Sequence, residues 1–572
     1  MHASAETRRP RITLQHDIVL IGSMMVLAAC GLIYEYLLAH YAGRIIGAME
    51  SSIYGMIGIM IVAMGVGAFL AKLIKDPYTG FAWLEVCIGF LGGSSILIMA
   101  GVIWLTYSLP QWLQQVYGVH PSMSMDGGYI AILQEASFVM PFVIGFILGV
   151  MIGMEIPLIA RIREHIHGKH IVHNTGTIYG ADYIGAGIGA AIWVIVCLKL
   201  PIMVAAIGTA AINALVGLIF LFRYQSELKS KHKLWFAHAM LISALILLSV
   251  MGIRFTQDMN STLFKDKVIY TKITAYQHIT LTERRSGKGL ATVVSLYING
   301  RLQFSSNDEA IYHSLLTYPP MLASARHDHI LVIGGGDGLA VRDILQWQPK
   351  SITVIDLDQS MIELFSGNDL ESQKYLRKIL LKLNKQSFLD HRVKIIIGDA
   401  FIEVEKLVSS RNHYDTIIVD LPDPSHPDLN KLYSGFFYSR LKELLSGDGA
   451  IAVQSTSPYH AKKAFISIGK TLTDAGFNTQ QYHTNVPSFG EWGWSIGTKR
   501  GKNALQRIRE TDTLPVSDPW ISKAQLEAAF VFAPSFYRNP KNVGVNHLGS
   551  HLIYHYHHDA WENENGIYFT YK

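Results

Sequence analysis

The chain has 572 residues, of which 49 are Lys or Arg and 44 are Asp or Glu, so its formal net charge is +5. A chain of this length with so small a charge is not a strongly basic protein of the kind that binds nucleic acid. Half of the residues are hydrophobic and 16% are charged, whereas about 25% of the residues of an ordinary soluble protein are charged. The composition therefore predicts a domain that lies in a lipid bilayer, and no nucleic-acid partner.

Apolar segments long enough to cross a bilayer as helices, which takes about 20 residues, are confined to the first part of the chain. We count about seven of them, at 18–40, 51–71, 82–107, 128–160, 176–198, 201–222 and 235–253. After Arg254 the sequence mixes polar and apolar residues, and no later run is long enough to span. We therefore expect an α-helical multi-pass membrane domain followed by a water-soluble half.

The basic residues of the loops predict the topology. A cytoplasmic N-terminus would leave only Arg44 and Lys199 in the outside loops, in agreement with the positive-inside rule. Seven spans would then put the soluble half outside, away from the cytoplasmic pools of nucleotide cofactors. Either the long stretch 128–160 upsets the count, or the soluble half faces outside; the supply of such molecules favours the cytoplasm.

Acidic residues inside the apolar segments are costly and are functional candidates by default. We single out Glu35, Glu135, Glu155 and Asp182. One interpretation is a site for a polyamine or another cation, formed by Glu35, Glu155 and Asp182. The other is that Glu155 lies at the surface near Arg161 and that Asp182 lies at a helix start, where the helix dipole favours it.

Two strand-like segments follow, at 274–284 and 292–306. Asn299 and Gly300 lie within the second segment. Such a pair is a strong signal for a two-residue hairpin turn, because both turn positions need a positive φ. We expect a small antiparallel sheet here.

A glycine-rich loop follows a short apolar strand and contains Gly334, Gly336 and Gly338. Glycines let the backbone turn tightly next to a ligand, and the start of the next helix favours a polar or anionic group. The following strand ends at Asp356, where a carboxylate would hold a ribose diol. A solvated strand end is the alternative for Asp356.

Acidic residues also follow the next two predicted strands, namely Asp399 and the pair Asp420 and Asp423. Strands that end in acidic residues predict a parallel α/β sheet with a ligand cleft at its carboxyl edge. Carboxylates repel a diphosphate, so the cleft suits an amine or other cationic substrate together with a nucleoside. An Asp-Pro turn is the alternative explanation of Asp423.

The order of these motifs resembles the spermidine synthase (polyamine aminopropyltransferase) family over residues 270–500. The motifs are YQHI at 276–279, NGRLQFSSNDEAIYH at 299–313, GGGDG at 334–338, DLD at 356–358, GDA at 398–400, DLPDP at 420–424 and LYSGFFY at 432–438. The apolar half resembles the multi-pass region of a bacterial subgroup, through GLIYEYLL at 31–38 and IGMEIPLIAR at 152–161. The resemblance implies a Rossmann-like, methyltransferase-like domain after a small β domain, and a place in the inner cell membrane.

The family reaction is the transfer of an aminopropyl group from decarboxylated S-adenosylmethionine to putrescine or a related amine, giving spermidine and 5′-methylthioadenosine. The donor is a co-substrate, and neither a tightly bound cofactor nor a metal is expected. Because the sulfonium already activates the carbon, the protein has to place a neutral amine in line and accept its proton. DLPDP replaces the family's DSSDP or DSTDP, which leaves the identity of the amine open.

The resemblance also implies a role for each site residue. Asp420 would be the proton acceptor, and Tyr312 would orient the attacking nitrogen. The amine would be held by His313, Asp337, Asp423 and Gln454. The nucleoside would contact Gln277, Gln303, Gly334, Gly336, Asp356, Asp399, Ala400 and Pro427, with Asp356 on the ribose hydroxyls and Asp399 near the adenine amino group.

The expected domains are a cytoplasmic tail (1–17), the membrane domain (18–254), a β domain (262–325), the catalytic domain (326–500) and a C-terminal extension (501–572). A dimer or tetramer is expected from the resemblance. The histidines of the extension, at 547, 551, 555, 557 and 558, alternate like a strand, and no further ligands accompany them in a metal-binding spacing. Two alternatives stay open: an S-adenosylmethionine-dependent methyltransferase on the same fold, and a polyamine transporter or sensor without catalysis.

Overall fold

The structure is a computed structural model. It describes residues 8–46, 49–117, 128–167, 171–261, 264, 266–274, 276–285, 292–368, 373–516, 518–538 and 542–562. The chain divides into two compact units, Met1–Val268 and Ile269–Lys572.

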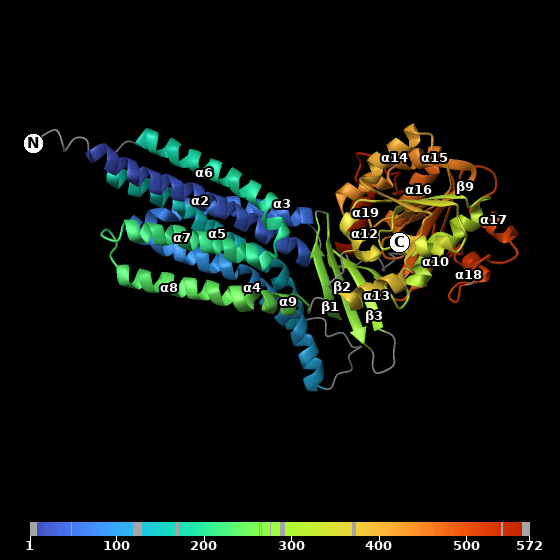
Figure 1. Ribbon diagram of the computed structural model, residues 1–572, viewed down its shortest axis with the longest axis horizontal. Coiled ribbons are helices and arrows are strands. Elements are labelled where there is room, and N and C mark those ends of the chain that lie inside the picture. Colours follow the sequence, from blue (N-terminus) through green and yellow to red (C-terminus); the bar gives the residue numbers. More distant parts are fainter. Residues whose placement is uncertain are drawn as a thin grey trace, which may run out of the picture. The chain divides into compact units, whose positions relative to one another are not determined.

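The first unit is a bundle of long helices, coloured blue to green in Figure 1. They are α2 (Arg8–Ile46), α3 (Met49–Leu70), α4 (Pro77–Tyr117), α5 (Gly128–His167), α6 (Ile171–Ile195), α7 (Ile202–Arg223) and α8 (Lys231–Leu247). Seven stretches among the described residues are helical, long and apolar enough to cross a membrane, as the sequence predicts. The stretch 128–160 lies within the single helix α5, so a second span hidden there does not explain the topology conflict.

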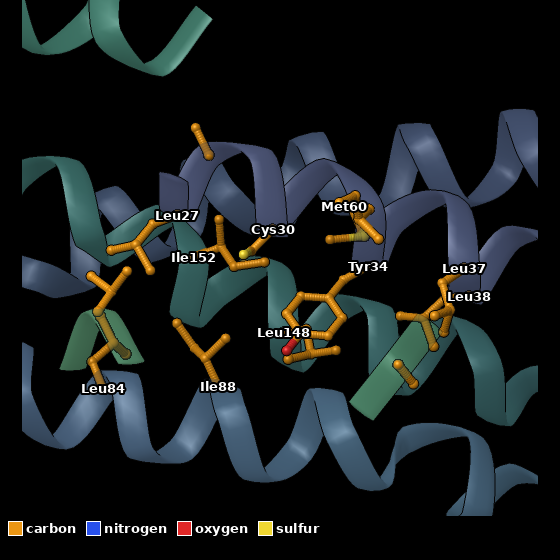
Figure 2. Packing of buried hydrophobic residues seen from close by; sticks show 14 of the residues in the cluster. Leu27, Cys30, Tyr34, Leu37, Leu38, Met60, Leu84, Ile88, Leu148 and Ile152 are labelled. Carbon is orange, nitrogen blue, oxygen red and sulfur yellow. The ribbon is translucent and has the colours of Figure 1, made fainter. Parts of the chain in front are cut away.

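Apolar side chains from α2, α4 and α5 form the core of this bundle (Figure 2). Cys30 and Tyr34 project from α2 into this core, which also contains Ile88 and Ile152. Other large apolar side chains, such as Phe69 on α3, are exposed. An exposed apolar surface on a bundle of this kind is typical of a protein that faces lipid.

A small sheet opens the second unit, with strand order β1-β2-β3-β4. The strands are β1 (Lys267–Ile273), β2 (His278–Arg285), β3 (Thr292–Ile298) and β4 (Arg301–Ser305), of which β2, β3 and β4 pair antiparallel. Asn299 and Gly300 join β3 to β4 with φ values of 51° and 79°. The predicted hairpin is therefore confirmed.

A seven-stranded sheet follows, in the order β10-β11-β9-β8-β5-β6-β7. The strands are β5 (His329–Gly334), β6 (Ser351–Asp356), β7 (Val393–Ile397), β8 (Tyr414–Asp420), β9 (Leu445–Gln454), β10 (Asn478–Val486) and β11 (Gly490–Thr498). From β9 to β7 the sheet is parallel, and β10 and β11 are antiparallel at one edge. The chain reverses its direction of strand addition between β5 and β8, which is where ligands bind in open α/β sheets.

Helices surround this sheet (Figure 1). Those that carry or support the site are α10 (Glu309–Ala323), α11 (Leu339–Leu345), α14 (Ala400–Ser409), the short 3-10 helix η6 (Pro427–Tyr433) and α19 (Leu552–Glu562). The sheet is apolar on both faces, because helices cover both sides of the inner strands. The fold class expected from the sequence is confirmed for this unit.

The strand expected at the C-terminal histidines is wrong, because His555, His557 and His558 lie on helix α19. His551, His555 and His558 are spaced by four and three residues. This spacing puts side chains on one face of a helix, and His555 is indeed exposed. His557 lies on the opposite face and is 1% exposed.

Candidate functional site

The strand register brings the acidic strand ends together. Asp420 at the end of β8 pairs with Gly334 at the end of β5. Ile333 of β5 pairs with Ile355 of β6, so Asp356 is the next residue beside the same loop. Parallel strands end at one edge of a sheet, and the predicted grouping of acidic residues at this edge is what the register produces.

The glycine-rich loop packs tightly against these carboxylates. A Cβ at Gly334 would lie 2.0 Å from the carbonyl oxygen of Asp420, and one at Gly336 would lie 2.7 Å from Oδ2 of Asp356. The N–H of Gly335 donates to the same carbonyl of Asp420, at 3.1 Å. Glycine is therefore required here because the loop and the acidic residues share one narrow space.

Tyr312 of α10 is bound directly to Asp420. Its O–H donates to Oδ1 of Asp420 at 2.8 Å, and its ring packs on Trp494 with centroids 5.5 Å apart. Burial raises the pKa of Asp420 to about 6, and the charge of Asp337 acts in the same direction against the opposing effects of His313 and Tyr312. A carboxylate with a pKa close to neutral is suited to act as a general base.

His313 adds a positive charge to this group of carboxylates. Its Nδ1 lies 3.0 Å from Oε2 of Glu309, and Arg342 binds the other oxygen of Glu309 at 2.7 Å. Burial opposes the protonation of His313, but the hydrogen bond with Glu309 and the charge of Asp337 outweigh it and raise the pKa to about 9. The imidazolium offsets part of the negative charge of Asp337 and Asp420.

Asp423 is held from two sides. Nε2 of Gln454 donates to its Oδ1 at 2.7 Å, and Nε2 of His557 lies 3.2 Å from its Oδ2. Burial would raise the pKa of Asp423, but the hydrogen bond and charge of His557, together with Gln454, hold it below its usual range. Asp423 is thus an anion near neutral pH. Tyr433 in turn donates to Oε1 of Gln454 at 3.2 Å.

Asp356 and Asp358 join the end of β6 to the small sheet. Oδ1 of Asp356 accepts the N–H of Asp358 at 2.8 Å, and burial raises the pKa of Asp356 to about 7. Nε2 of Gln277 donates to Oδ2 of Asp358, also at 2.8 Å. Gln277, which lies between β1 and β2, is therefore brought to the site through Asp358.

Asp399 lies after β7 and caps helix α14, whose first residue is Ala400. Its Oδ1 accepts the N–H of Phe401 at 2.9 Å, and its Oδ2 is 2.6 Å from Nζ of Lys431. Lys431 belongs to η6, which begins at Pro427. The contact thus ties Asp399 and Ala400 to the segment that holds Pro427.

Gln303 lies on β4, and its Nε2 donates to the carbonyls of Arg301 and Leu302 in the same strand. The residues that the sequence-based prediction missed are His557, Lys431, Asp358, Glu309 and Arg342. Asp358 and Glu309 lie inside quoted motifs, whereas the signal for His557 was the helical spacing of its neighbours. Among the described residues, no group of three or more His, Cys, Asp or Glu side chains is arranged to hold a metal ion.

Residues 309–508 match the family model described as spermine/spermidine synthase domain. A polyamine aminopropyltransferase of Shewanella oneidensis is 52% identical over 551 residues, which cover 96% of this chain and 96% of that protein. Polyamine aminopropyltransferase 1 of Streptomyces coelicolor is 31% identical over 553 residues, 95% of each chain. A solved spermidine synthase in complex with the transition-state analogue AdoDATO is 23% identical, with a TM-score of 0.40, over 47% of this chain and 86% of that one.

Proposed function

Because this chain belongs to the polyamine aminopropyltransferase family and thus transfers aminopropyl groups, we propose that the carboxyl edge of β8, β5 and β6 is where decarboxylated S-adenosylmethionine meets putrescine or a related amine. The observation that carries this proposal is the hydrogen bond from Tyr312 to Asp420. This hydrogen bond holds Asp420, a base of near-neutral pKa, at the point between β5 and β8 where the direction of strand addition reverses. The carboxylate of Asp356 lies beside it.

In this reaction the lone pair of the amine nitrogen attacks the methylene carbon next to the sulfonium. The new C–N bond forms as the C–S bond breaks, and the bonding pair goes to sulfur, which leaves as the neutral thioether of 5′-methylthioadenosine. The extra proton on nitrogen passes to Asp420. Tyr312 holds Oδ1 of Asp420, so the other oxygen is the one available to the amine.

The donor is proposed to lie over the glycine-rich loop. Asp356 would accept hydrogen bonds from both ribose hydroxyls of the donor. Gln277, which is held by Asp358, would contact the nucleoside close to Asp356. The N–H groups of Gly334 and Gly336 and the segment that begins at Pro427 would line the rest of the nucleoside site. Asp399, Ala400 and Gln303 are proposed to contact the nucleoside, with Asp399 close to the adenine amino group.

The amine is proposed to lie between Asp337 and Asp423. A diamine presents one neutral nitrogen for attack and keeps the other protonated, and an ionised Asp423 would bind the protonated end. Gln454 and His557 keep Asp423 in place. The role proposed for His313 is to hold the amine end near Asp337, where the positive charge of the imidazolium favours the ionised form of the carboxylates.

The location and assembly of the chain are also proposals. The seven apolar helices fit a multi-pass protein of the inner cell membrane. We place the catalytic half on the cytoplasmic side because the donor is supplied there, although seven spans and the basic loops argue for the other side. Labelling of single cysteines introduced into the loops with a membrane-impermeant reagent decides between the two. The proposed domains are 1–17, 18–254, 262–325, 326–500 and 501–572, in a dimer or tetramer.

A panel of donors and amines tests the reaction. The purified full-length chain is incubated with decarboxylated or ordinary S-adenosylmethionine and with putrescine, cadaverine, propane-1,3-diamine or spermidine, and the products are identified by mass. We expect 5′-methylthioadenosine and one aminopropylated amine from the decarboxylated donor. Formation of S-adenosylhomocysteine from the ordinary donor, with no aminopropylated product, would overturn the proposal in favour of a methyltransferase.

A further inference from the structure

We propose that the first unit holds a second site for a protonated amine, formed by Tyr34, Glu85, Glu155 and His238. These four residues come from the helices α2, α4, α5 and α8. All of them precede the residues of the catalytic cleft in the sequence. None of the four belongs to the amine site proposed above. The choice of an amine as the ligand rests on the proposed function, whereas the existence of a cation site rests on the contacts, the burial and the unpartnered atoms of these side chains.

Glu85 and His238 meet at Gly217 of α7. A Cβ at Gly217 would lie 2.7 Å from Nε2 of His238 and 3.1 Å from the Cβ of Glu85. On the same helix, Nδ2 of Asn213 donates to Oε2 of Glu85 at 2.6 Å. This contact uses one carboxylate oxygen of Glu85 and fixes the orientation of the other.

Tyr34 and Glu155 complete the group. The Tyr34 ring packs on Gly92 of α4, where a Cβ would lie 2.4 Å from the ring, and Gly92 is two helical turns after Glu85. Figure 2 shows Tyr34 projecting from α2 into the core of the bundle. The carboxylate of Glu155 lies close enough to interact electrostatically with both Glu85 and Tyr34. Asp182 of α6 adds a third carboxylate in electrostatic contact with Glu155.

Each of the four residues has a buried polar atom without a hydrogen-bond partner in the described part of the chain. The atoms are the hydroxyl oxygen of Tyr34, Oε1 of Glu85, Oε2 of Glu155 and Nε2 of His238. The side chains are 0%, 0%, 1% and 1% exposed, in that order. A buried polar atom that lacks a hydrogen-bond partner destabilises the folded chain, so four such atoms in one group are a feature that a ligand would explain.

The unpartnered atoms would be satisfied by a ligand that donates hydrogen bonds and carries a positive charge. Nδ1 of His238 lies 3.0 Å from the carbonyl oxygen of Leu234, so Nδ1 carries a proton, and in the neutral imidazole Nε2 is then an acceptor. Carboxylate oxygens are acceptors when ionised. Within the described residues, no Lys or Arg interacts with Glu85 or Glu155. The group is therefore rich in acceptors and lacks a cation.

An alkylammonium group fits this chemistry better than a hard inorganic cation, and among the described residues no group of three or more His, Cys, Asp or Glu side chains is arranged to hold a metal ion. Its three N–H donors can be shared among two carboxylate oxygens and an imidazole nitrogen, whereas hard cations such as Ca²⁺ and Mg²⁺ prefer sites made of oxygen ligands. Amines are also the molecules that this family of enzymes consumes and produces. The ligand class we assign is a protonated alkylamine such as putrescine or spermidine.

The structure changes the membrane site expected from the sequence. Glu155 and Asp182 interact, but among the described residues Glu35 has no electrostatic contact with either of them. A surface position for Glu155 is wrong, since it is 1% exposed. Glu85 was not among the predicted residues, although it lies in the apolar segment 82–107 and meets the same criterion as they do.

Equilibrium dialysis of radiolabelled spermidine against the full-length chain in lipid nanodiscs tests the second site. We compare the wild type with the double variant Glu85→Gln, Glu155→Gln, and expect the variant to bind one spermidine fewer per chain. Glu35→Gln, which changes a carboxylate of the same bundle outside the group, is the matched control and should bind as the wild type does. The thermal unfolding transition of each variant in nanodiscs shows whether the helical bundle is folded, and the transfer rate shows whether the catalytic half is intact.

Three outcomes are distinguishable. Equal numbers of bound spermidine in the wild type and the double variant would overturn the proposed amine site. A second outcome would also overturn it: NaCl or acid raises the thermal unfolding temperature of the wild type but not of the double variant, and spermidine raises neither. The group would then bind a metal ion or a proton and not an amine. Failure of the proposed catalytic function would be seen separately, as loss of the aminopropylated product.

Discussion

The phenol O–H of Tyr312 donates a hydrogen bond to Oδ1 of Asp420, with the two oxygens 2.8 Å apart. This contact leaves a single oxygen of the proposed base free to receive a proton from substrate. It also lowers the pKa of Asp420 against the effect of burial, which raises it to about 6. The two residues come from α10 and β8 and are 108 residues apart in the chain.

Replacement of Tyr312 by Phe should slow transfer and move its pH dependence. A hydrogen bond to a charged group contributes about 1.5–3 kcal/mol, so we expect kcat to fall by about 10- to 100-fold. Loss of the bond raises the pKa of Asp420, and therefore the acidic limb of kcat/KM should move to higher pH. Tyr438→Phe is the control, since the Tyr438 hydroxyl is buried without a partner among the described residues; an equal effect of both changes would contradict the assigned contact.

Asp420→Asn should remove most of the transfer and spare the donor site. A general base contributes about 10²- to 10⁴-fold to the rate, so kcat should fall within this range. Binding of 5′-methylthioadenosine, measured by calorimetry, should change little. Asp390→Asn removes a carboxylate that pairs with Arg392 at 2.8 Å before β7, and it should leave kcat unchanged. Retention of kcat in Asp420→Asn would exclude Asp420 as the proton acceptor.

The pH dependence should respond to Asp337. The base works when it is deprotonated, so activity should rise with pH through an apparent pKa of about 6 for Asp420. The negative charge of Asp337 helps to raise that pKa, and Asp337→Asn should therefore move the acidic limb of kcat/KM to lower pH. The protonation of the free amine affects both enzymes equally and cancels in the comparison. A shift to higher pH would show that Asp337 does not act on the base by charge.

His557→Asn should weaken binding of the amine more than it slows the chemical step. The imidazole keeps the pKa of Asp423 low; without it the pKa rises, and a smaller part of Asp423 is ionised as the pH falls. We expect KM for the amine to increase by about 10-fold, which is the loss of one moderate hydrogen bond, and to increase further at lower pH. His555→Asn changes an exposed histidine of the same helix. If KM for the amine were unchanged in His557→Asn, helix α19 would have no part in binding the amine.

Comparison of Gly334→Ala with Gly490→Ala distinguishes the stability lost to steric crowding from the stability lost to backbone strain. Both glycines have a φ of 79°, but a Cβ at Gly334 would lie 2.0 Å from the Asp420 carbonyl, whereas one at Gly490 meets no atom within 4 Å. Positive φ costs alanine about 1–2 kcal/mol, which should be the whole loss of stability in Gly490→Ala. Gly334→Ala should lose more stability and also lower kcat, because β8 has to move. Equal melting temperatures for the two variants would contradict this packing.

The sequence predicted those parts of the protein that depend on local patterns. Apolar runs identified the seven helices, Asn299 and Gly300 identified the hairpin, and acidic residues after successive strands identified the edge of the sheet where we propose that the site lies. The strand period and the rules of parallel sheets suffice for these features, because each depends on residues that are near in sequence or on one rule of topology.

The features that the sequence missed depend on contacts between distant parts of the chain. His557 reaches Asp423 across 134 residues, and its own surroundings contain only a helical spacing that was read as a strand. Glu85 depends on Asn213, which is 128 residues away. Nothing in either local sequence shows which face of a helix will be buried against which partner, so such pairs are found only once the packing is known.

The pairing of Gly334 with Asp420 in the β5–β8 ladder has a consequence for how new activities could arise on this chain. The proposed base is fixed by main-chain hydrogen bonds of the central sheet, whereas Asp423 depends on side chains from a strand end and a C-terminal helix. Substitutions around Asp423, which we propose to bind the amine, should therefore alter the choice of amine while the position of the proposed base is preserved. Enzymes with different polyamine products could diverge, or be engineered, by changing Gln454 and His557 and leaving the ladder intact.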